Sequence, residues 1–205
     1  MAIAINGTGT ITGISVGGLN DSIITSSELA NGAVTAAKIG SLPAGSILQV
    51  VQSVKTSEQS NSSASYVQIT DLNCSITPSS TNNKILITVL VSSNIYSGYN
   101  SSFFRLSKGG TAISGALGND SGDSNAEVSF ADTATTTTNA KSMNTVGTTY
   151  LDSPSSTSAL TYGVQWAVPN TNSTYTNYIN GPYARDGSSY RARAISTITL
   201  MEVAV

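Results

Sequence analysis

Hydrophobic and polar residues alternate along much of the chain after position 46, at the period of two that places successive side chains on opposite faces of a β-strand. The cleanest alternation covers residues 160–168, where Leu160, Tyr162, Val164, Trp166 and Val168 share one face. Similar patterns predict strands at residues 66–69, 72–76, 103–106 and 195–203. The alternation places the one tryptophan in the core of a sheet rather than in a ligand site.

Two further segments are more apolar. Residues 47–54 form a mostly apolar run, and residues 84–91 have apolar side chains on both faces. In the second segment one face has Leu86 and Leu90, and the other has Ile85, Ile87, Val89 and Val91. Such a pattern is typical of a strand that is covered on both sides. We therefore expect residues 84–91 to have neighbours on both faces.

Turn-forming residues separate these segments. Thr77-Pro78-Ser79-Ser80 predicts a turn, and Gly109-Gly110 predicts a hairpin between residues 103–106 and 111–113. Residues 118–125 form a polar loop, and residues 126–130 a weaker strand. About eight to ten strands with almost no helix predict an all-β domain at residues 46–205, a jelly-roll-like antiparallel β-sandwich.

The first 45 residues differ from the rest, because glycines interrupt them repeatedly. The stretches between these glycines are too short to fold into a core of their own, so their apolar side chains need another surface. Thr25-Ser26-Ser27-Glu28 has the spacing of a capping box, which predicts a short helical turn, and residues 35–39 form a second short unit. The surface that covers these apolar side chains could be the β domain, a sister chain or a larger particle. We predict that residues 1–45 are an extended segment for attachment and oligomerisation, through Ile3, Ile5, Ile11, Ile14, Val16, Leu19, Ile23, Leu29, Val34 and Ile39.

The composition narrows the classes of function. The chain has 60 serines and threonines and 17 asparagines, but charged residues make up only 10% and the net charge is −2. A nucleic-acid-binding surface needs clustered basic residues, and the nine here are scattered apart from three arginines near the C-terminus. No apolar run is long enough to predict a membrane span. Cys74, the single cysteine, lies in an alternating run and is expected to be a small buried side chain.

Candidate catalytic chemistry is sparse. The chain has no histidine, which excludes Ser-His-Asp and Cys-His catalysis and removes the commonest nitrogen ligand for metals. Asp120 and Asp123 flank a glycine in a polar loop and are weak candidates for a calcium site, although a solvated loop explains them better. We predict a protein that is not an enzyme and needs no cofactor.

One tyrosine-rich segment has the character of a contact surface. Tyrosine combines a rigid stacking face with a hydroxyl group, which suits recognition of sugars and proteins. The same rings could instead pack in the sandwich, and the pattern leaves both readings open. The residues predicted to bind a receptor are Tyr175, Tyr178, Asn180, Tyr183, Arg185 and Asp186.

Several motifs resemble structural proteins of bacteriophage virions. The sequence SELANGAVTAAKI at positions 27–39 is similar to linker units in tail-fibre proteins of phages, including those of marine and cyanobacterial hosts. SILQVVQ at 46–52, TPSSTNNKILI at 77–87, YLDSP at 150–154 and STITLMEV at 196–203 are similar to a widespread phage virion domain.

The resemblance implies a virion component made in the host cytoplasm, a homotrimer held to other tail or capsid proteins by its N-terminus. Its β domain would face outward as a short tail fibre or receptor-binding adhesin, in contact with a glycan or protein of the host surface. The alternatives are a head fibre or capsid decoration protein and, less favoured, a polysaccharide-degrading tailspike, for which the long repeats of a parallel β-helix are missing.

Overall fold

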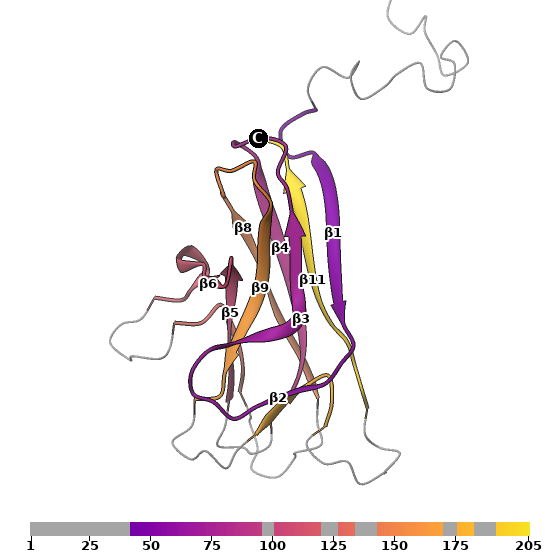
Figure 1. Ribbon diagram of the computed structural model, residues 1–205, viewed down its shortest axis with the longest axis vertical. Helices are drawn as coiled ribbons and strands as arrows, with labels where there is room; N and C mark the ends of the chain where they lie inside the picture. The colour runs from indigo at the N-terminus through magenta and orange to yellow at the C-terminus, as the bar shows by residue number, and fades with distance from the viewer. Residues whose placement is uncertain (1–41, 96–100, 120–126, 134–142, 170–175, 183–191) are drawn as a thin grey trace, which may run out of the picture. The chain divides into compact units, whose positions relative to one another are not determined.

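The computed structural model describes residues 42–95, 101–119, 127–133, 143–169, 176–182 and 192–205, and these form an all-β domain (Figure 1). Its strands in chain order are β1 (Ile47–Lys55), β2 (Gln59–Asn61), β3 (Val67–Ile76), β4 (Lys84–Asn94), β5 (Ser101–Lys108), β6 (Thr111–Ala112), β7 (Phe130–Thr133), β8 (Asn144–Asp152), β9 (Leu160–Ala167), β10 (Asn177–Ile179) and β11 (Ser196–Val203). One turn of 3-10 helix, Ser114–Ala116, follows β6, and no α-helix occurs in the described segments.

The strands form two antiparallel sheets that pack face to face. Sheet A has the order β1-β11-β4-β8, and the short strand β10 pairs with the last residues of β4 and with β2. Sheet B has the order β3-β9-β5, with β6 and β7 along the outer edge of β5. The long strands β1, β3, β4, β5, β8, β9 and β11 alternate between the two sheets along the chain. The first and the last of them, β1 and β11, pair in sheet A. This order is that of a jelly roll, and it confirms the predicted fold class.

The core lies between the inner faces of the two sheets. Sheet A contributes the inward side of β4, where every second residue from Ile85 to Val91 is fully buried. Sheet B contributes Phe104 and Trp166, whose rings stack at 6.3 Å, and Phe104 also stacks on Phe130 at 4.8 Å. Trp166 is fully buried and Cys74 is buried, as the alternation of each segment predicts.

Most strand predictions are confirmed, with differences at the boundaries. The strands predicted at residues 66–69 and 72–76 are one strand, β3, which begins at Val67 and has an irregularity near the positive-φ residue Asp71. Gly109 and Gly110, both at positive φ, form the hairpin turn between β5 and β6. The weaker strand predicted at residues 126–130 instead begins at Phe130. The sequence pattern did not predict β2, β8 or β10.

The outer side of β4 differs from expectation. Leu86 and Leu90 were expected to be covered, but within the described residues Leu90 is exposed and Leu86 is only half-buried. The sandwich therefore covers this strand on one side.

The N-terminal and C-terminal ends of the β domain lie next to each other. β1 and β11 run side by side, and backbone hydrogen bonds join Gly45 to Ala204 and Ala204 to Ser46 (Figure 1). Close to this end, the buried carboxylate of Glu202 accepts hydrogen bonds from Ser79, Asn83 and Gln49, at 2.6–2.7 Å. These bonds tie the β3–β4 turn to the C-terminal strand. Burial alone would raise the pKa of Glu202. The hydrogen bonds outweigh this effect and lower the pKa to about 2.

The residues predicted to attach the chain lie outside the described part of the structure, as do the one or two short helical turns predicted within residues 25–39. Across the described segments, the structure has no helix that combines the length and the hydropathy needed to cross a membrane.

Candidate functional site

A cleft of about 380 Å³ lies where the β5–β6 hairpin of sheet B meets the end of β8 in sheet A. The hairpin and the 3-10 turn that follows it provide one side of the cleft, and the residues at the end of β8 provide the other. The lining residues are Lys108, Ala112, Ile113, Ser114, Gly115, Tyr150, Leu151, Asp152 and Ser153.

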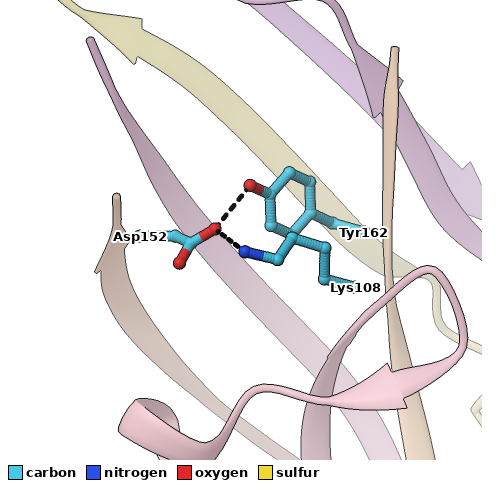
Figure 2. Close-up of polar contacts among 3 residues, drawn as sticks. All are labelled: Lys108, Asp152 and Tyr162. Carbon is cyan, nitrogen blue, oxygen red and sulfur yellow. Dashed lines mark hydrogen bonds and ion pairs between the residues drawn. The ribbon is translucent and has the colours of Figure 1, made fainter. Parts of the chain in front are cut away.

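A cluster of three polar side chains borders this cleft and joins the two sheets (Figure 2). Lys108 on β5 and Tyr162 on β9 are cross-strand neighbours in sheet B, so their side chains point the same way, toward Asp152 on β8. The Lys108 ammonium donates to Asp152 Oδ2 at 2.8 Å, and the Tyr162 hydroxyl donates to the same oxygen at 2.6 Å. A buried carboxylate needs such partners, because an unpaired charge is costly inside a protein.

The three groups differ in how far they reach solvent. Tyr162 is fully buried and Asp152 nearly so, but the side chain of Lys108 is about one third exposed at the cleft. Burial, and then the hydrogen bond to Asp152 and the charge of that residue, raise the pKa of Tyr162 far above its ordinary value. Tyr162 therefore stays protonated at every physiological pH and acts as a fixed donor.

The cleft has the groups needed to bind a neutral polyhydroxyl ligand. Lys108 has three ammonium protons and uses one on Asp152, while the second oxygen of Asp152 points away from both donors (Figure 2). Ser114 and Ser153 add hydroxyl groups, and the ring of Tyr150 adds an aromatic surface. Asp152 is the one carboxylate among the lining residues, so the cleft lacks the carboxylate pair of most glycosidases.

The tyrosine-rich segment predicted to bind a receptor lies mostly outside the described residues, which is true of Tyr175, Tyr183, Arg185 and Asp186. Tyr178 is described and lies half-buried on β10, opposite Ser60 of β2 and Asn94 of β4. Recognition by this group of residues stays a prediction.

Asn180 has a structural role. Its side chain is buried, and its amide donates to the carbonyl oxygens of Lys55 and Ser57 at 2.8 and 3.2 Å. The amide oxygen accepts a bond from the Ser196 hydroxyl at 2.6 Å. Asn180 thereby joins the ends of β1, β10 and β11.

Asp120 and Asp123, the weak candidates for a cation site, also lie outside the described residues. Within the part that the structure describes, no cluster of three or more carboxylate or thiol groups could hold a metal ion.

Sequence reasoning did not find the cleft. Lys108, Asp152 and Tyr162 are separated along the chain and meet only because the sheets pack against each other. One local signal was present, since Lys108 directly precedes the Gly109-Gly110 turn and its position on the hairpin could be read from the sequence.

A scan against models of protein families and a search of curated proteins found no match to this sequence.

Proposed function

We propose that this chain is a non-enzymatic structural protein of a bacteriophage virion, a short tail fibre or adhesin whose β domain binds a glycan of the host surface. The observation that carries the proposal is the polar cleft between the two sheets, at the edge of a jelly roll. Jelly rolls recur in viral capsid and lectin domains, and this analogy of fold supports both the virion setting and the ligand class.

The chemistry of the cleft supports a saccharide. Sugars present neighbouring hydroxyl groups that both donate and accept, and here an ammonium, a carboxylate, two serines and one aromatic ring line the same cleft. A volume of about 380 Å³ is within the usual range for small-ligand sites. A single site of this kind binds weakly, so several copies on one particle would raise the overall avidity.

Binding of the intact protein to an array of bacterial surface glycans tests the proposal. Ser114→Trp places a bulky ring in the cleft, and Asn82→Trp places the same ring on an exposed turn elsewhere. We expect the wild-type chain and Asn82→Trp to bind the same glycans, and Ser114→Trp to lose at least about tenfold in affinity. Equal binding by both variants would move recognition away from the cleft, and the absence of binding by the wild-type chain would count against an adhesin.

The position on the particle is tested separately. Gold labelling of the C-terminus on purified virions should place the protein at the tail. Label over the capsid would instead favour the head fibre or decoration protein.

A further inference from the structure

The outward-facing surfaces of the two sheets differ in polarity. A β-sheet that faces water on one side normally has polar residues there. The outer face of sheet B largely follows this rule, with Asn73, Ser75, Arg105, Thr161 and Gln165, and the half-buried Phe103 is its one large apolar side chain among the described residues of β5. The outer face of sheet A does not follow it.

Strand register arranges the outer face of sheet A into three rows across its four long strands. The first row is apolar and consists of Val50, Met201, Leu86 and Leu151. The second row is polar and consists of Gln52, Thr199, Thr88 and Thr149. The third row consists of Val54, Thr197, Leu90 and Gly147. Val50, Val54, Leu90 and Leu151 are 55%, 45%, 49% and 43% exposed in the described structure.

We propose that the outer face of sheet A, defined by these three rows, is the surface through which copies of this chain associate. The occupant is a second copy of the same face. This inference does not depend on the proposed adhesin function.

The charges of the face argue for such a partner. None of its three rows contains a charged residue. A charged partner surface would lose hydration there without gaining an ion pair, whereas an apolar surface interrupted by hydroxyl groups would fit. Among the described outer faces, the one with this chemistry is the face of sheet A itself.

The polar row has hydrogen bonds within its own sheet, which lowers the cost of covering it. The Gln52 amide donates to the Thr199 hydroxyl at 2.8 Å, and the hydroxyls of Thr88 and Thr149 lie 3.4 Å apart. Polar groups that keep their hydrogen bonds can be removed from water at little cost. A second copy can therefore align the apolar row and the polar row with their equivalents.

The size of the face fits the centre of an interface. Four strands about 4.8 Å apart, and five residues of about 3.4 Å each, give the three rows a plan of roughly 19 by 17 Å. Stable interfaces bury about 800 Å² per partner around an apolar centre and a polar rim. The sequence pattern agrees, because residues 84–91 have the composition of a strand covered on both sides, while the sandwich covers only one.

Thiol labelling and mass measurement of the full-length chain test this inference. Val54→Cys places a thiol on the face, and the matched control Val67→Cys places one on sheet B at a valine that is 39% exposed. The native Cys74 is buried and provides the background rate. The mass in solution is compared with the 21.0 kDa of one chain.

We expect a mass of two or more chains. Val54→Cys should then be labelled at least about tenfold more slowly than Val67→Cys, because roughly nine in ten copies are associated and only the free copies expose the thiol. Dilution until the mass is that of one chain should make the labelling rates of Val54→Cys and Val67→Cys equal. Equal rates in an oligomer would overturn the inference, since the copies would then meet elsewhere. Slow labelling of Val54→Cys at a single-chain mass would also overturn it, because the cover would then come from the same chain.

Discussion

The side chain of Leu90 on β4 lies over the backbone of Gly147, its cross-strand partner on β8. A Cβ atom on residue 147 would lie 2.9 Å from Leu90 Cδ2 and would collide with the carbonyl oxygen of Val89. The close approach of β4 and β8 at this point therefore requires glycine.

We predict that Gly147→Ala lowers the free energy of unfolding by about 2 kcal/mol, because β4 and β8 must separate locally to make room for the methyl group. Gly118→Ala is the control, because a Cβ there would lie 3.7 Å from the nearest atom. Urea denaturation of both variants measures the difference. Equal stability of the two would show that β8 can shift away from β4 without cost.

Glu202 should make stability depend on acid pH. Its pKa is lowered to about 2 from an ordinary 4.5, so the charged form stabilises the fold at neutral pH, and this contribution is lost as the pH falls from about 4.5 toward 2. We expect Glu202→Gln to cost about 2 kcal/mol at pH 7 and much less near pH 2.

Thermal unfolding at several pH values measures this dependence. Glu127→Gln, which changes an exposed carboxylate, is the control and should show no such convergence with the wild type. A constant difference between Glu202→Gln and the wild type from pH 7 to pH 2 would contradict the role assigned to the charge.

Tyr162 should show its effect at alkaline pH. Its pKa is raised in the folded state, so the stability it contributes is complete below its ordinary value of 10.0 and is lost as the pH rises above that value. We expect Tyr162→Phe to be about 1 kcal/mol less stable than the wild type at pH 7, because Asp152 loses a donor. The difference should narrow above pH 10.0, where tyrosine ionises in the unfolded wild type alone. Denaturant titrations at pH 7 and at alkaline pH test both statements, and a gap that widens would contradict them.

Asn180 combines a backbone effect with a side-chain effect, which two substitutions separate. Its φ of 62° lies in the left-handed region, which glycine adopts freely and alanine does not. We expect Asn180→Gly to cost about 2 kcal/mol through the lost amide bonds, and Asn180→Ala to cost about 1 kcal/mol more through strain. Unfolding curves of the two variants provide the comparison. If both variants lose the same stability, the positive φ imposes no constraint.

The sequence predicted the long strands that contain an apolar run or a clean alternation, and it did not predict β8, which has neither. β9 alternates cleanly, and its inward residues Tyr162, Val164 and Trp166 are fully buried. In β8 the inward residues are Val146, Thr148, Tyr150 and Asp152, with a glycine between them. This segment forms a strand because it pairs with β4, and the local sequence pattern does not indicate such pairing.

The cleft was inaccessible to sequence reasoning for a related reason. Tyr162 belongs to a run whose period predicts a core residue, and that prediction is correct. Its hydroxyl nevertheless reaches Asp152 on the other sheet, and only the packing of the two sheets brings these groups to one place. The tyrosine-rich segment is the reverse case, because its composition can be recognised in the sequence but most of it lies outside the described residues.

The pairing of β1 with β11 also constrains how the domain is made. The register joins Ile47 to Val203, so sheet A combines the first and the last long strand of the described domain. Contacts so distant in sequence form slowly, because a long loop must close before they stabilise anything. A nascent chain on the ribosome can build sheet B, whose three long strands end at Ala167, while β1 still awaits its partner. Synthesis of β11 then completes sheet A, so a chain that lacks β11 should have an open edge that aggregates rather than a smaller stable domain.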